Sequence, residues 1–203
     1  MRVWIDQTEL QSATNLDEAL ELARVHSEQS GRLIIDILAD GKPLDESMLE
    51  SNKQPDAISE LRLTTTDPGA FLSETLHTAR ETLTLIREDQ GTAADHLRTG
   101  QLEAAVEALT AVLQGWQAVR DVVDQSAELA GIDVTTMSFA GTTGSACIER
   151  LGVTLREIRD ALAKQDWSTL GDSIEYDLDE QAEHWDTLMS AMSDRVQDEK
   201  HRS

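Results

Sequence analysis

The chain has 203 residues, 39% of them hydrophobic, which is enough for one large domain or two small ones with real cores. It carries 39 acidic side chains against 17 basic ones, a formal net charge of −22. Such a surface repels nucleic-acid phosphates and anionic lipids, so nucleic acid and membranes are not expected as partners. A general adaptation of the host to salt would give the same composition, and the charge alone therefore does not identify a binding surface.

Two further features indicate a cytoplasmic protein. The first residues lack the apolar stretch of a secretion signal, and no apolar run approaches the ~20 residues of a membrane-spanning helix. Cys147 is the single cysteine, so an intrachain disulfide is excluded and a reducing compartment fits. We interpret Cys147 as a core residue rather than a nucleophile, because no histidine neighbours it in the sequence.

Residues 1–67 alternate between short β-rich runs and one helical stretch. Asn15 followed by Glu18 has the pattern of a capped helix start, and Gly31 is a typical helix stop. Asp40 and Gly41 form a dipeptide typical of tight hairpin turns. The predicted elements are a strand over 1–6, a short strand near 9–13, a helix between Asn15 and Gly31, strands at 33–38 and around 61–63, and a returning segment at 43–44.

This order of elements is that of the β-grasp fold, and residues 33–65 resemble ubiquitin-like domains. Ubiquitin-like modifiers and sulfur carriers depend on a free C-terminal Gly-Gly. Here the last predicted strand instead runs through Asp67, Pro68 and Gly69 into a helix. The resemblance therefore implies a docking module rather than a conjugated protein.

After Gly69 the apolar residues recur every three or four positions, which predicts helices. Gly100 separates a first helix from a second that stops near Gly131, and residues 132–144 lack a period and are expected to be a connection. Whether the first helix continues past Gly91 is left open by the pattern. The expected organisation is α+β: a β-grasp domain at 1–67, an antiparallel four-helix bundle at 68–193 with its last two helices near 148–162 and 167–189, and a charged, fraying tail at 194–203.

The segments 164–167, 174–178 and 184–185 give the second half a resemblance to bacterial proteins of unassigned function in which a β-grasp unit precedes a helical bundle. Some of those proteins are associated with flagellar genes, and four-helix flagellar export chaperones share the bundle form. The resemblance implies a chaperone-like or adaptor role linked to motility or secretion. Its motifs are too unspecific to carry over any binding residue.

The predicted partner-binding residues are three acids of the last helix and one aromatic residue. Asp172, Glu175 and Asp179 recur at helical spacing, where like charges cost a few tenths of a kcal/mol per pair. They form either a solvated face or a patch for a basic or helical segment of a protein partner. Trp4 lies opposite the apolar face of the first strand, where it either covers the sheet or anchors a partner.

No catalytic motif accompanies either half: glycine-rich nucleotide loops, a nucleophile elbow and Cys-x-x-Cys pairs are all missing. Carboxylate-bridged metal sites in bundles need a Glu-x-x-His from each of two helices, and only Glu74 and His77 fit that pattern. We therefore expect no cofactor and no catalytic residue, and a non-enzymatic protein-binding adaptor or chaperone-like factor. The alternatives are a metal-dependent bundle enzyme using Glu74 and His77, and a regulatory or structural oligomer.

Overall fold

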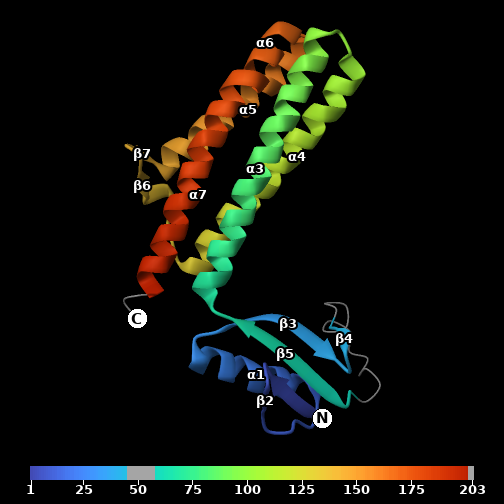
Figure 1. The fold of residues 1–203 in the computed structure, drawn as a ribbon, viewed down its shortest axis with the longest axis vertical. Coiled ribbons are helices and arrows are strands. Elements are labelled where there is room, and N and C mark those ends of the chain that lie inside the picture. Colours follow the sequence, from blue (N-terminus) through green and yellow to red (C-terminus); the bar gives the residue numbers. More distant parts are fainter. Residues whose placement is uncertain (45–57, 201–203) are drawn as a thin grey trace. The chain divides into compact units, whose positions relative to one another are not determined.

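The computed structural model describes residues 1–44 and 58–200 and divides the chain into two compact units, Met1–Phe71 and Leu72–Ser203. The first contains a small mixed sheet and the second is built from long helices (Figure 1), so the predicted α+β class is confirmed. Residues 45–57, and residues 201–203 of the predicted tail, lie outside the described residues. Within the described ranges, no helix is both long enough and apolar enough to pass through a membrane.

In the first unit, one helix packs on a five-stranded sheet of order β2-β1-β5-β3-β4. The β1–β5 pair is parallel and the other pairs are antiparallel. Val3, Ile5, Leu61 and Leu63 point toward α1, whose small Ala19 and Ala23 let the helix lie close to the sheet. The bounds are β1 Arg2–Ile5, β2 Thr8–Glu9, α1 Leu16–Ser30, β3 Leu33–Ala39, β4 Lys42–Pro43 and β5 Glu60–Thr66.

The predicted ends of α1 are confirmed by its capping contacts. The Asn15 side chain accepts a hydrogen bond from the Glu18 amide, and the Glu18 carboxylate in turn accepts one from the Thr14 amide. Gly31 closes the helix with φ of 62°, a conformation that glycine adopts without strain. The second strand is shorter than expected and begins earlier, at Thr8.

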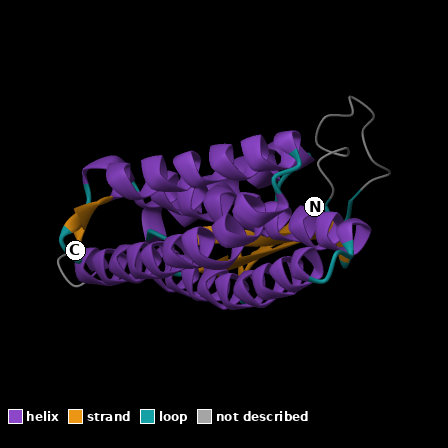
Figure 2. Ribbon diagram, turned by 90° about the horizontal axis from the view of Figure 1, so that it is seen from above, coloured by secondary structure: helices purple, strands orange, loops and turns teal. Residues whose placement is uncertain are grey.

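The second unit consists of long helices that run alongside one another around one apolar core (Figure 2). Trp116 and Trp185 meet edge to face in that core with ring centroids 5.9 Å apart. Gly91 does not interrupt the first of these helices, which settles the question that the pattern left open. The bounds are α3 Pro68–Arg98, α4 Leu102–Ala130, α5 Gly144–Lys164, α6 Trp167–Asp172, a π-helical turn η2 Ser173–Asp177, and α7 Leu178–Lys200.

Two differences from the expected helices concern the last part of the chain. The last predicted helix is divided into α6, η2 and α7, because four-residue steps link the buried Leu170, Ile174, Leu178 and Ala182. Each such step advances about 40° beyond one α-helical turn, and the wider π turn keeps those side chains on the core side. α7 also continues past Asp194, where fraying was expected, and Val196 is buried in the core.

The expected loose connection between α4 and α5 has structure of its own. It contains a 3₁₀ turn, Val134–Thr136, and a strand pair, β6 Ser138–Phe139 with β7 Thr142–Thr143, which contacts α7. The tight turn at Ala140 and Gly141 has positive φ at both residues. Val134, Met137 and Phe139 are buried, so this segment closes one part of the core.

Candidate functional site

Two of the three predicted acids form ion pairs with arginines of α3. Arg87 donates two hydrogen bonds, of 2.5 and 2.9 Å, to the Asp179 carboxylate, and Arg98 forms an ion pair with Glu175. The hydrogen bonds that Arg87 donates to Asp179 raise the pKa of Arg87 above its ordinary value. These two carboxylates therefore connect the η2–α7 segment to α3.

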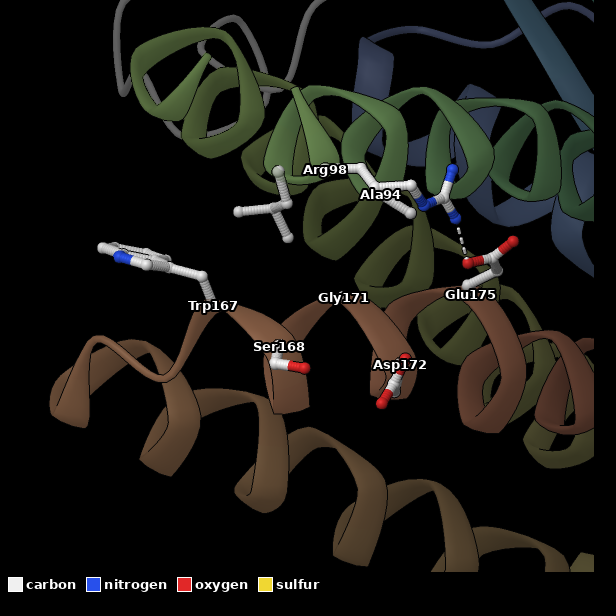
Figure 3. A pocket seen from close by; sticks show the side chains of 8 residues that line it. Ala94, Arg98, Trp167, Ser168, Gly171, Asp172 and Glu175 are labelled. Carbon is white, nitrogen blue, oxygen red and sulfur yellow. Dashed lines mark hydrogen bonds and ion pairs between the residues drawn. The ribbon is translucent and has the colours of Figure 1, made fainter. Parts of the chain in front are cut away.

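Asp172, the third predicted acid, lines a hollow between α3 and α6 with Arg98, Trp167 and Glu175 (Figure 3). Its side chain is exposed and turned away from Arg98, and within the described chain it has no ion-pair partner. The hollow holds a volume of about 250 Å³, with Ala94 and Leu97 on its α3 side. The structure thus brings Asp172 and Glu175 to one hollow but gives them different environments.

Trp4 lies on the sheet face opposite α1, as its place in the strand predicts. The Arg62 guanidinium carbon lies 5.6 Å from the centroid of the Trp4 ring, which is a cation–π distance. Arg62 also donates a 2.5 Å hydrogen bond to Glu60. The ring is half-buried beneath this arginine. Trp4 belongs to the first unit, whereas the acids of α6, η2 and α7 belong to the second.

The carboxylate-bridged metal site is not formed among the described residues. Glu74 and His77 both lie on the exposed side of α3, and the His77 ring approaches Glu81 at 3.6 Å. Within the described ranges, no three His, Cys, Asp or Glu side chains converge in a way that could hold a metal ion. Cys147 is fully buried in the core, and this burial raises its thiol pKa to about 11.

A second hollow, of about 290 Å³, lies between α4 and α5. Its floor consists of Ile148, Leu151, Gly152 and Leu155 of α5. Arg120 approaches from α4 and Arg156 from α5.

An apolar stripe on α4 shares one side of the helix with Arg120, which lines this hollow. Leu102, Val106, Leu113 and Arg120 are spaced by four, seven and seven residues, which places them on one side of the helix. The three apolar side chains of this stripe are 38, 43 and 38% exposed. We call the hollow and this stripe the α4/α5 groove. Large apolar side chains gathered on an exposed helix side are typical of surfaces that contact another protein.

The two arginines of the α4/α5 groove differ from most arginines of this acidic chain. In the part of the chain that the structure describes, neither Arg120 nor Arg156 has a hydrogen-bond or ion-pair partner. Ion pairs with acids occupy Arg2, Arg24, Arg32, Arg62, Arg80, Arg87, Arg98 and Arg159.

Comparison with protein-family models gives one match, to the family described as a domain of unknown function (DUF8042), over residues 74–188. That span is more than half of the chain. The chain belongs to the DUF8042 family. No curated protein and no solved structure matches it.

The DUF8042 span contains every residue that lines the two hollows, and it leaves out the whole sheet unit with Trp4. The α4/α5 groove was not predicted from the sequence, because the apolar recurrence after Gly69 was interpreted only as evidence for helices. The signal was present: Leu102, Val106 and Leu113 follow helical spacing beside the core positions rather than on them. The unpaired state of Arg120 and Arg156 has no sequence signal.

Proposed function

We propose that this DUF8042 protein is a non-enzymatic protein-binding factor, an adaptor or chaperone-like protein acting in the cytoplasm. Its first unit would be a β-grasp module, which the central parallel β1–β5 pair and the single covering helix support. Its second would be a four-helix bundle of α3, α4, α5 and α7, supported by their common core. The resemblance to export chaperones leads us to propose a client in motility or secretion.

The observation that carries the proposal is the exposed apolar stripe of α4. An exposed leucine or valine is ordinary by itself. Leu102, Val106 and Leu113, however, share one side of α4 with Arg120, which lines a hollow. Trp4 and Asp172 are proposed as additional contacts, since both lie near the surface and Asp172 has no ion-pair partner within the described chain.

Co-isolation from the native host tests this function with a matched pair of variants. Leu102→Ser combined with Leu113→Ser makes the stripe polar, whereas Leu85→Ser changes a 60% exposed leucine on the outer side of α3. We expect one or more proteins to co-purify with the wild-type chain and with Leu85→Ser, but not with the double variant. If wild type and double variant retain the same proteins, the α4 stripe is not the binding surface.

A further inference from the structure

We propose that the α4/α5 groove binds an acidic amphipathic helix of a protein partner, an inference that rests on the protein-binding role proposed above. The partner helix would place its apolar side chains on the groove and its carboxylates against Arg120 and Arg156. This surface has the opposite charge preference to the acidic segment around Asp172, Glu175 and Asp179.

The length of the groove favours a helix as its occupant. Leu102 and Arg120 are 18 positions apart on a continuous helix, which corresponds to about 27 Å at 1.5 Å per residue. Along α5, Ile148, Leu155 and Leu162 recur at seven-residue intervals and are only partly buried. Apolar side chains that repeat over about three turns of α4 and about four turns of α5 match the side of a third helix with apolar residues every three or four positions.

The charges favour an acidic occupant. Arg120 and Arg156 line one hollow and find no carboxylate within the described chain, although acids outnumber bases by more than two to one. Glu149 is the only acid among the residues that line this hollow. A lysine-rich helix would instead bring like charges against the two guanidiniums, which opposes its binding. A carboxylate there would gain hydrogen bonds from a guanidinium that has no competing intramolecular partner.

Fluorescence anisotropy with two synthetic helical peptides tests the proposal on the full-length chain. Both peptides carry leucine at the same positions spaced by three and four, and they differ only in having glutamate or lysine beside the leucines. We expect the glutamate peptide to bind at least tenfold more tightly than the lysine peptide, because only the former can pair with the arginines. The variant Arg120→Gln/Arg156→Gln should remove that preference. Arg150→Gln, which removes one positive charge outside the groove lining, should keep it.

Each outcome of the peptide experiment either supports or overturns the proposal that the groove binds an acidic helix. Equal affinity for the two peptides, or an unchanged preference in Arg120→Gln/Arg156→Gln, overturns it, as does failure of both peptides to bind. If both peptides bind equally and Leu102→Ser/Leu113→Ser abolishes binding, the protein-binding function stands and only the charge assignment fails. A wild-type chain that is dimeric by light scattering and becomes monomeric in Leu102→Ser/Leu113→Ser would assign the groove to a second copy and also overturn the proposal.

Discussion

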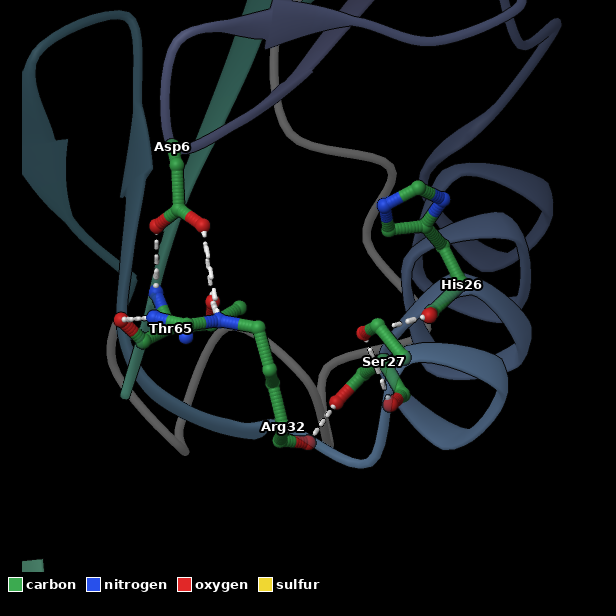
Figure 4. Close-up of polar contacts among 6 residues, drawn as sticks. Asp6, His26, Ser27, Arg32 and Thr65 are labelled. Carbon is green, nitrogen blue, oxygen red and sulfur yellow. Dashed lines mark hydrogen bonds and ion pairs between the residues drawn. The ribbon is translucent and has the colours of Figure 1, made fainter. Parts of the chain in front are cut away.

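Asp6 directly follows β1 in a left-handed conformation, with φ of 52°, and connects three parts of the first unit (Figure 4). Its carboxylate accepts hydrogen bonds from the Thr65 amide and hydroxyl, each 2.8 Å long, and Arg32 lies 3.8 Å away. The two hydrogen bonds from Thr65, followed by the charge of Arg32, lower the pKa of Asp6 below its ordinary value of 3.8. The left-handed turn is thus fixed by charge-assisted hydrogen bonds.

Asp6→Asn tests this contact and its pH dependence. Because the folded pKa is lowered, the ionised carboxylate stabilises the fold fully above pH 3.8, and this contribution is lost as the pH falls through the folded value. Asparagine tolerates the left-handed conformation, so the variant mainly removes charge and one acceptor. We expect the variant to lower the free energy of unfolding by about 1 kcal/mol at neutral pH. This is small for hydrogen bonds to a charged group, because the Asp6 side chain is 42% exposed and solvent screens its charge.

Urea unfolding at neutral and at acidic pH measures the effect. The difference from wild type should narrow as the pH falls below 3.8. Asp36→Asn, which changes an exposed acid of β3, is the control and should be close to neutral. A loss in Asp6→Asn that is the same at both pH values would contradict the assigned role.

Gln90 is a buried amide, 2% exposed, in the core side of α3. Neither its amide nitrogen nor its oxygen has a hydrogen-bond partner within the described residues, and an unpaired buried polar group costs about 1–3 kcal/mol. Gln90→Met keeps the volume and removes both polar atoms, so we expect unfolding free energy to rise by about 1–2 kcal/mol. Thermal unfolding measures the change, with exposed Gln125→Met as the control. A destabilised Gln90→Met would show that the amide is satisfied in solution.

At the scale of the element, three glycines of the long helices predict three different results on replacement by alanine. A Cβ at Gly91 meets no atom within 4 Å, whereas one at Gly115 would lie 2.7 Å from the Ile86 Cγ1. At Gly144 it would lie 2.0 Å from the Val134 carbonyl oxygen, which is backbone and cannot rotate away.

We expect Gly91→Ala to stabilise the protein by about 0.5–1 kcal/mol, because alanine is the better helix former. Gly115→Ala should lose about 1–2 kcal/mol as α3 and α4 separate around Ile86. Gly144→Ala should be the most damaging of the three, since the connection must move. Chemical unfolding of the three variants gives the order directly, and a neutral Gly144→Ala would show that the connection does not pack closely on α5.

An element can be predicted from the sequence when the contacts that determine it join residues close together in the chain. The sequence predicted the caps of α1, the Asp40–Gly41 turn and the helical recurrence of apolar residues in α3 and α4. Each of these features depends on residues only a few positions apart in the chain. The π turn and the β6–β7 pair were missed, because each depends on fitting against the rest of the core. The ion pairs of Glu175 and Asp179 depend on α3, about 80 to 90 residues away in the sequence, which no local pattern reveals.

At the scale of the whole molecule, each unit has its own core and its own tryptophan reporters. The first core has few buried residues, with Trp4 nearby, whereas the second is large and contains Trp116 and Trp185. Because a small core gives little stability, we predict that urea unfolds the first unit at a lower concentration than the second. The fluorescence of a Trp4→Phe variant should report only the later transition, and a single transition seen by all tryptophans would contradict independent cores.

The charge of −22 also determines how molecules of this protein meet. At low ionic strength two copies repel one another from tens of ångströms, whereas at physiological ionic strength the field fades within about 8 Å. An incoming acidic helix would feel the same repulsion until it reached the groove itself. Added salt should therefore raise the association rate of the acidic helix while weakening its ion pairs with the groove. The affinity should be highest at an intermediate salt concentration rather than at the lowest.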